Sequence, residues 1–239
     1  MKAKIDLTLV LACFNETDVF TASVARIVDV LKTSKLSYEI IFVDDCSMDK
    51  TPELIARACK RYAHCTALYH ERNYGRGRTV ADGFYKAKGE VVGFIDIDCE
   101  VGPEYIPQLV SVIAQRKADV VIGKRVYRTS SGSIIREILS RGYQWLSDVM
   151  IGTGGLDTET GYKFFRKNAI LPVLETMIYA GWFWDTEIMV RSKRAKLRIV
   201  EVPVVFIRRF DKQSSVNIIS DTADYLINLW NFRRQLARE

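Results

Sequence analysis

Two aspartates separated by one residue, Asp96 and Asp98, form the pattern in this sequence best suited to metal binding. They follow the apolar run 91–95, which predicts a buried strand. Because side chains on an extended chain alternate between two faces, both carboxylates should point the same way at the end of that strand. Two such carboxylates repel each other unless a cation lies between them, and Mg²⁺ or Mn²⁺ with substrate phosphates as further ligands would suit the position. The alternative is a helix start, because acids ahead of Pro103 favour the helix dipole.

Other acids also stand at the ends of predicted strands. Asp44 and Asp45 follow the run 38–43, and Glu16 follows the run 5–12. Such a carboxylate either caps the turn into the next helix or accepts a hydrogen bond from the ribose or base of a nucleotide.

Several common catalytic patterns are missing from the sequence. The glycine-bearing loop 72–78 has neither the third glycine of a dinucleotide fingerprint nor a Walker lysine, which argues against classical NAD binding and P-loop chemistry. Neither His64 nor His70 has a partner at metal-ligand spacing, so we interpret both as structural. No nucleophile elbow occurs.

The aromatic stretch 181–187 allows two interpretations. It is either apolar core followed by a helix start, or the wall of an acceptor site with Asp185 or Glu187 at its rim.

The elements that must position these residues alternate between strand and helix patterns. An alternation of this kind predicts a parallel, doubly wound sheet with the informative loops at one shared edge. The expected strands of the first half are 5–12, 38–43, 65–70, 91–95 and 119–123. The helices between them include one opened by Thr51 and Pro52 and one closed by Gly89.

The second half of the chain has a different pattern. We expect a helix over 133–151, a glycine break at 152–155, a strand over 161–166, a helix over 185–195, an edge strand over 198–207 that tolerates Pro203, and a terminal helix over 218–236. The terminal helix carries apolar residues and then arginines. It either lies on an anionic membrane surface or packs on the domain or on a partner subunit.

The composition is that of an ordinary folded protein, with 48% hydrophobic and 27% charged residues among 239. The net charge of +6 points to an anionic partner, but no basic and aromatic stripe suggests nucleic acid. Five cysteines without a C-x-x-C pair, in a sequence with no signal-peptide pattern, predict reduced thiols in the cytoplasm. No apolar run approaches the roughly 20 residues of a membrane span.

Taken in order, the motifs resemble glycosyltransferase family 2, and most of all its polyprenol-phosphate sugar synthases of the dolichol-phosphate mannose synthase type. The segments that carry the resemblance are 12–16, 44–51, 72–77, 96–98, 123–125, 157–163, 184–187 and 201–203. Three departures stand out. Ala12 and Phe14 replace a proline and a tyrosine, Arg76 replaces a lysine, and the segment 209–215 lacks the family's glycine and final lysine.

The resemblance implies a GT-A type α/β fold, with a Rossmann-like, mostly parallel central sheet flanked by helices. It implies a single catalytic domain over 1–217, with a nucleotide-sugar half at 1–123 and an acceptor half at 124–217, followed by an amphipathic helix at 218–239. The expected reaction is inverting transfer of a hexose from a nucleotide-diphosphate sugar, GDP-mannose, UDP-glucose or a UDP-N-acetylhexosamine, to a polyprenyl phosphate at the cytosolic face of a membrane. The alternative acceptor is a hydroxyl of a cell-surface glycan or a lipid-linked oligosaccharide.

The resemblance also assigns roles to residues. Asp98, Asp185 and Arg125 are the expected catalytic residues, with Asp185 as the base if the acceptor is a hydroxyl. The expected metal ligands for Mg²⁺ or Mn²⁺ are Asp96, Asp98 and Glu100. The expected nucleotide-sugar contacts are Ala12, Phe14, Glu16, Asp44, Asp45, Asn73, Arg76, Asp96 and Ile97. The expected contacts of the acceptor phosphate are Arg125, Arg136, Arg209 and Ser214. A second copy of the chain or a membrane-anchored subunit is a further expected partner.

Overall fold

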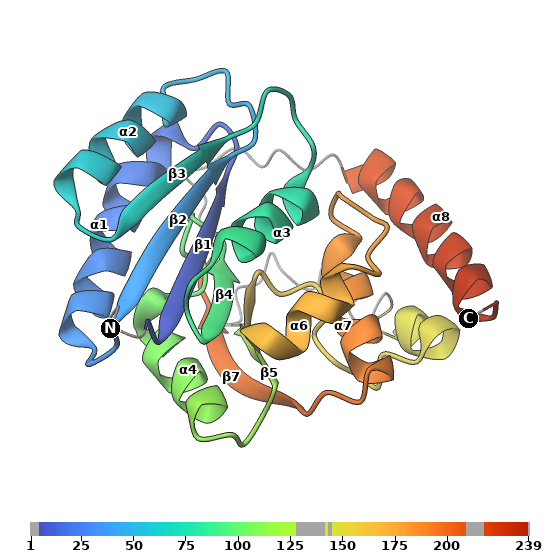
Figure 1. Cartoon of the computed structure of the whole chain (residues 1–239). Coiled ribbons are helices and arrows are strands. Elements are labelled where there is room, and N and C mark those ends of the chain that lie inside the picture. The colour runs from blue at the N-terminus through green and yellow to red at the C-terminus, as the bar shows by residue number, and fades with distance from the viewer. Residues whose placement is uncertain (1–4, 128–141, 143–144, 209–217, 239) are drawn as a thin grey trace.

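The computed structural model describes residues 5–127, 142, 145–208 and 218–238 (Figure 1). Its centre is a seven-stranded sheet in the order β3-β2-β1-β4-β6-β5-β7. The strands are β1 (Leu7–Cys13), β2 (Tyr38–Asp44), β3 (Cys65–Tyr69), β4 (Val91–Ile95), β5 (Val120–Tyr127), β6 (Tyr162–Arg166) and β7 (Ile199–Phe206). Only β6 runs antiparallel to its neighbours in this sheet, so the expected mostly parallel sheet is confirmed.

Helices cover both faces of the sheet (Figure 1). Buried residues of α1 (Thr17–Thr33), α2 (Thr51–Arg61) and α4 (Ile106–Ala114) pack on one face. Buried residues of α3 (Arg76–Lys86), α6 (Lys167–Leu174) and α7 (Trp184–Arg194) pack on the other. A short 3₁₀ turn, η1 (Pro103–Tyr105), precedes α4, and α8 (Ile218–Leu236) ends the fold.

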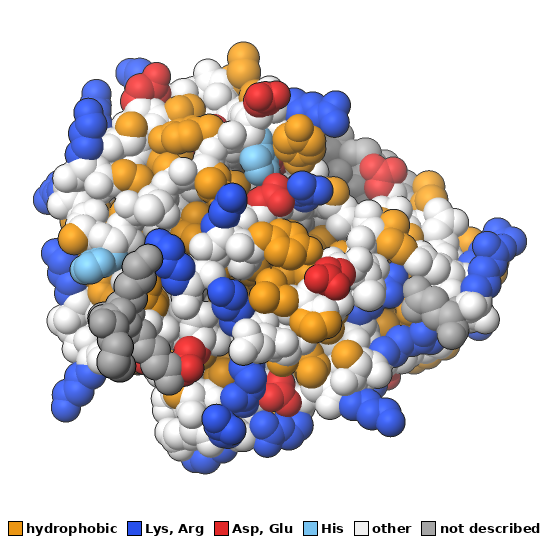
Figure 2. Space-filling model, viewed as in Figure 1, with side chains coloured by type: hydrophobic (Ala, Val, Ile, Leu, Met, Phe, Trp, Pro, Cys, Tyr) orange, Lys and Arg blue, Asp and Glu red, His pale blue; other side chains and the backbone are white. Residues whose placement is uncertain are grey.

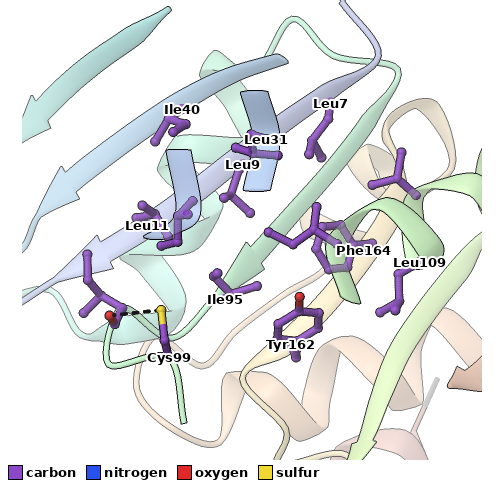
Figure 3. Packing of buried hydrophobic residues seen from close by; sticks show 14 of the residues in the cluster. Leu7, Leu9, Leu11, Leu31, Ile40, Ile95, Cys99, Leu109, Tyr162 and Phe164 are labelled. Carbon is purple, nitrogen blue, oxygen red and sulfur yellow. Dashed lines mark hydrogen bonds between the residues drawn. The ribbon is translucent and has the colours of Figure 1, made fainter. Parts of the chain in front are cut away.

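The alternation of side chains along β1 divides the core between these two layers. Leu7, Leu9 and Leu11 face the layer of α1, α2 and α4, where they meet Ile40 and Ile95 (Figure 3). The intervening Val10 faces the opposite layer, which contains α3. The strand therefore belongs to two cores, in agreement with its almost entirely apolar sequence, LTLVLAC.

Several boundaries differ from the expected ones. Helix α2 does begin at Thr51, but Thr51 is its first helical residue and Lys50 is the N-cap. Helix α3 ends at Lys86, before the expected Gly89. Helix α6 was not expected, because Pro172 lies within it. Of the helix predicted over 133–151, only 142 and 145–151 lie among the described residues, and these are helical.

The edge position of β7, expected from Pro203, is confirmed by the strand order. The terminal helix α8 packs on the domain through Leu229, Phe232 and Leu236, which form an apolar cluster with Phe183 of the neighbouring loop and with other residues. Among the described residues, no helix combines the length and apolar character needed to cross a membrane.

Candidate active site

A cavity of about 730 Å³ opens at the edge of the sheet where the strands β1 and β4 end. This edge is the place where ligands bind in open α/β sheets. The described residues that line it are Ala12, Cys13, Phe14, Glu16, Asp45, Asn73, Gly75, Arg76, Thr79, Asp96, Ile97, Asp98, Glu100, Val101, Arg125, Glu159, Thr160, Gly161, Tyr162, Gly181, Trp182, Phe206 and Arg208. Both halves of the chain therefore contribute to one cavity.

Asp96 and Asp98 both line this cavity, but they lie on a turn and not on the strand itself. Strand β4 ends at Ile95, and the Cys99 N–H donates to the Asp96 carbonyl oxygen at 3.2 Å. Cys99 adopts a positive φ of 54°, which lets the chain reverse there. The side chain of Asp96 is 49% exposed. Both aspartates therefore line one cavity, as predicted. The reason given for the prediction does not apply, because the two residues follow the strand and their side chains do not alternate as strand residues would.

Gly161 of the neighbouring segment supports the Asp96 carboxylate. In the antiparallel register Ile95 pairs with Tyr162, and the Asp96 N–H donates to the Gly161 carbonyl oxygen at 3.0 Å. A Cβ atom added to Gly161 would lie 1.8 Å from Asp96 Oδ2. Only glycine fits there without moving the carboxylate.

Arg76, the first residue of α3, reaches across the cavity floor to two carboxylates. Its Nη2 donates to Asp96 Oδ1 at 2.5 Å, and its Nη1 donates to Asp185 Oδ2. The guanidinium also stacks near the rings of Phe94 and Trp182, with 5.1 Å and 5.4 Å to the centroids. Burial opposes the charged form of Arg76, but Asp185 and Asp96 outweigh this effect and raise its pKa.

The glycines next to Arg76 determine how it enters the helix. Gly75 has φ +89°, a conformation that L side chains rarely adopt, and it is the N-cap of α3. A Cβ atom on Gly77 would lie 2.2 Å from Trp184 Cβ, so α3 and α7 pack through this glycine.

Asp185 lies beneath the cavity, with only 4% of the residue exposed. Its Oδ1 accepts a hydrogen bond from Lys163 Nζ at 2.5 Å, while its Oδ2 accepts from Arg76. Lys163 has no exposed surface, and its ammonium also donates to the Thr160 carbonyl oxygen. Burial lowers the pKa of Lys163, and the neighbouring Asp185 only partly offsets this. The role of Asp185 as a catalytic base stays a prediction.

At the end of the cavity next to β2, Asp45 accepts three hydrogen bonds from the segment 70–75. Its Oδ1 binds His70 Nδ1 at 2.7 Å and the Tyr74 N–H at 2.8 Å, and its Oδ2 accepts from the Gly75 N–H at 2.9 Å. His70 also lies 3.3 Å from Asp82. This arrangement agrees with a structural interpretation of His70, and it leaves Oδ2 with capacity for one further donor.

The other predicted nucleotide-sugar residues divide into two groups. The cavity-lining group is Ala12, Phe14, Glu16, Asn73, Arg76, Asp96 and Ile97. Asp44, by contrast, is 3% exposed, and its Oδ2 accepts from the Ser47 N–H at 3.1 Å, the turn-capping alternative for this residue. A role for Asp44 in nucleotide binding stays a prediction.

Asp49, which belongs to the segment 44–51 together with Asp44, connects the first residues of the helices α1 and α2. Its Oδ2 accepts from the N–H and hydroxyl of Thr17 at 3.1 Å and 2.6 Å, and its Oδ1 accepts from the Thr51 N–H at 2.9 Å. The motif residue thus fixes α1 against α2.

At the opposite end, Arg125 is held by carboxylates. Its Nε and Nη2 donate to the two oxygens of Asp157 at 2.9 Å and 2.7 Å, and Nη2 lies 3.4 Å from Glu159. Burial raises the pKa of Glu159, although Arg125 opposes it. Of the other predicted acceptor residues, Arg136, Arg209 and Ser214 lie outside the described residues.

The aromatic stretch 181–187 is divided between the cavity and the apolar core, and its role as the wall of an acceptor site stays a prediction. Trp182 is 53% exposed and lines the cavity, whereas Phe183 and Trp184 are buried. Glu187 is fully buried and paired with Arg191 at 2.7 Å, so it lies away from the rim.

The described residues fit a divalent ion only in part. No three acid, histidine or cysteine side chains of the described segments converge tightly enough to form a complete ion site. Asp96 and Asp98 nevertheless both line the cavity, although Asp98 Oδ1 also accepts a hydrogen bond from the Glu100 N–H at 3.2 Å. Carboxylate oxygens are what Mg²⁺ or Mn²⁺ needs when substrate phosphates supply its other ligands. Glu100 also lines this part of the cavity.

Sequence reasoning assigned no role to Lys163, Thr160, Gly161 or Arg208. A signal existed for Lys163 because it lies between the aromatic residues of the strand YKFFR, where a lysine at a buried position requires a counter-ion.

Comparison with known proteins identifies the family and the fold. The family model for glycosyl transferase family 2 matches residues 8–173, more than half of the chain. The chain belongs to glycosyl transferase family 2. Curated relatives of this family member include glycosyltransferase AglD of Haloferax volcanii, 26% identical over 206 residues, and the dolichyl-phosphate beta-glucosyltransferase of Saccharomyces cerevisiae, 27% identical over 222 residues.

The two alignments each cover 84% of this chain, but 33% of AglD and 66% of the yeast protein. The chain thus spans less than two thirds of either relative. Among solved structures, the glucosyl-3-phosphoglycerate synthase of Mycobacterium tuberculosis with Mn²⁺, UDP and glucosyl-3-phosphoglycerate has a TM-score of 0.71 at 18% identity. That match covers 97% of this chain and 81% of the other, and it confirms the GT-A fold.

Proposed function

We propose that this family 2 member is an inverting glycosyltransferase that moves a hexose from a nucleotide-diphosphate sugar to a polyprenyl phosphate. The observation that carries the proposal is a single cavity that combines the Asp96 and Asp98 pair at one side with the cations Arg125 and Arg208 among its other lining residues. The relatives named as dolichyl-phosphate glucosyltransferases support the choice of acceptor.

The donor would lie along the strand ends of β1, β2 and β4. Phe14, 41% exposed, offers a ring face to the base, and the second acceptor site of Asp45 Oδ2 suits a base N–H. The M. tuberculosis synthase was crystallised with UDP or UDP-glucose and Mn²⁺, which supports a uridine donor here as the first choice over GDP-mannose.

Asp96 and Asp98 would hold the divalent ion on the donor diphosphate. When bound, the ion supplies Lewis-acid stabilisation of the charge that develops on the leaving diphosphate. The chain's own residues orient the donor, with Arg76 fixed next to Asp96 and Trp182 forming a wall of the cavity.

The burial of Asp185 favours a phosphate acceptor over a hydroxyl acceptor. A sugar hydroxyl needs a general base to remove its proton, and Asp185, the predicted base, is enclosed between Arg76 and Lys163. A polyprenyl phosphate is already anionic at neutral pH and needs cations instead. Arg125 lines the cavity while Asp157 fixes its orientation, and a guanidinium suits phosphate oxygens.

We also propose that the outer face of α8 lies on a membrane surface. Leu226, Ile227 and Trp230 are 44%, 57% and 55% exposed and recur at helical spacing, opposite the face that packs on the domain. Arg233 and Arg234 continue this exposed side, and Figure 2 shows basic side chains at the C-terminal end of α8. An apolar face followed by cations suits an anionic lipid surface. The cytosolic side of that membrane stays a prediction.

The test is a panel of nucleotide sugars, including UDP-glucose and GDP-mannose, each with Mn²⁺ or Mg²⁺ and a short polyprenyl phosphate. We expect transfer from one donor, loss of transfer in EDTA, and at least about a 100-fold loss in Asp98→Asn. The variant should keep the wild-type melting temperature, because Asp98 lies at the cavity and not in the core. Transfer by Asp98→Asn at the wild-type rate in EDTA would exclude the metal-dependent reaction.

A further inference from the structure

Lys163 is a charged side chain at a fully buried position of the sheet. It lies on β6 between Tyr162 and Phe164, and it pairs in register with Phe94 and Ile122 on the flanking strands. No part of the residue is exposed. A buried ammonium is costly unless its donors are satisfied, and the proposed reaction does not use it.

The ammonium of Lys163 makes two contacts that lead to the cavity by separate routes. It donates to Asp185 Oδ1 at 2.5 Å, and the other oxygen of Asp185 binds Arg76. It also donates to the carbonyl oxygen of Thr160. Thr160 precedes Gly161, whose carbonyl oxygen and Cα support Asp96.

Both routes end at the ion pair between Arg76 and Asp96. The charged side chains along the first route form a row of alternating charges in which each contacts the next: Lys163, Asp185, Arg76 and Asp96. The row runs from a fully buried cation to a half-exposed carboxylate at the cavity. Such a row fixes the orientation of its exposed end, because each member is held by the one below it.

We propose that Lys163 and Asp185 are positioning residues that hold Arg76 and the Asp96 carboxylate in the orientation the donor diphosphate and its cation require. The inference rests on the proposed function and deepens it. It assigns Asp185 to the support of the donor site and takes the role of base away from it.

The experiment compares three variants of the full chain with the wild type. Lys163→Met removes the charge and keeps the unbranched side chain as far as the ε position. Lys163→Met combined with Asp185→Asn removes both charges, so that no unpaired buried charge remains to unfold the protein. The matched control, Glu187→Gln with Arg191→Met, removes a second buried ion pair of α7 that does not contact the cavity.

Two quantities are measured for each protein: the urea midpoint of unfolding, and the calorimetric dissociation constant of UDP-glucose with Mn²⁺, or of GDP-mannose with Mn²⁺ if the wild type binds that donor. We expect the charge-neutral Lys163 and Asp185 double variant to bind the donor about 10- to 100-fold more weakly, the usual range for residues that orient a ligand's direct contacts. The control should lose stability and keep the wild-type dissociation constant.

A folded double variant with wild-type donor affinity would overturn the positioning role. So would an equal loss of affinity in the control, because the effect would then follow stability and not position. Failure of the wild type to bind any nucleotide sugar is a separate result, which would contradict the proposed function itself.

Discussion

Replacement of Gly161 by alanine should disable the site while leaving the fold intact. The added Cβ would lie 1.8 Å from Asp96 Oδ2, and Cβ atoms essentially never come closer than 3.0 Å to a heavy atom that is not near them in the chain. The carboxylate oxygen must therefore move by at least 1.2 Å, the difference between these two distances. We expect a movement of this size to displace the whole carboxylate and to lengthen the 2.5 Å contact between Asp96 Oδ1 and Arg76 Nη2.

The expected effect on stability is small. The Arg76–Asp96 pair joins a side chain that is 13% exposed to one that is 49% exposed, so its loss should cost at most about 1 kcal/mol. Alanine also lowers the conformational entropy of the unfolded chain, which raises the free energy of unfolding by about 0.4–1 kcal/mol. Activity should fall much further, because a 1 Å misplacement of a catalytic group costs about 100-fold, or about 2.7 kcal/mol of transition-state stabilisation.

The assay measures the transfer rate to polyprenyl phosphate at saturating donor, together with the urea midpoint. Gly142→Ala is the matched control, since no described atom lies within 4 Å of a Cβ at that exposed helical position. Wild-type transfer by a folded Gly161→Ala protein would refute the reasoning, because Asp96 would then function equally well after displacement.

Three further predictions concern other parts of the molecule. Asp49→Ala should lower the free energy of unfolding by about 1–3 kcal/mol, measured by urea denaturation, because it removes the shared cap of Thr17 and Thr51. Hydrogen bonds from arginines lower the pKa of Asp119 from 3.8 to about 2, so its contribution to stability is present above pH 4 and is lost as the pH falls towards 2. In Asp119→Asn the free energy of unfolding should therefore fall less between pH 4 and pH 2 than it does in the wild type, by on the order of 1 kcal/mol. An unchanged pH dependence would contradict the pairing of Asp119 with the arginines. Trp230→Ser should reduce flotation with anionic vesicles several-fold at an unchanged melting temperature, whereas equal flotation of the two proteins would remove the support for membrane contact through α8.

The local pattern of the sequence was sufficient to predict most of the fold. The alternation of Leu7, Leu9 and Leu11 against Val10, together with helical spacing in the segments between strands, determines two apolar layers around a sheet. The carboxyl ends of parallel strands share one edge, so the acids of the first half could be placed at one site without any contact information.

Contacts between distant segments were not predictable in the same way. The pairing of Lys163 with Asp185 depends on how α7 packs against β6, and no local pattern encodes that distance. Asp185 at the start of a helix is equally consistent with a cap, a rim residue or a buried counter-ion, and only the packing of Gly77 against Trp184 brings Arg76 within reach of it. The turn at 96–99 was hidden for a similar reason, because Cys99 is not a residue type that signals a positive φ.

The distribution of charge supports the need for a cation at this site. The whole chain carries +6, which predicted an anionic partner, yet the described cavity lining has the opposite balance. Its acidic members are Glu16, Asp45, Asp96, Asp98, Glu100 and Glu159, and its basic members are Arg76, Arg125 and Arg208. Six acids against three bases give a formal charge of −3. A sugar diphosphate alone would be repelled by the acids of this lining, so a donor that arrives with a divalent ion is favoured electrostatically. We therefore expect the donor's dissociation constant to rise at least tenfold in EDTA, and a donor that binds equally well without the ion would show that the arginines alone are sufficient.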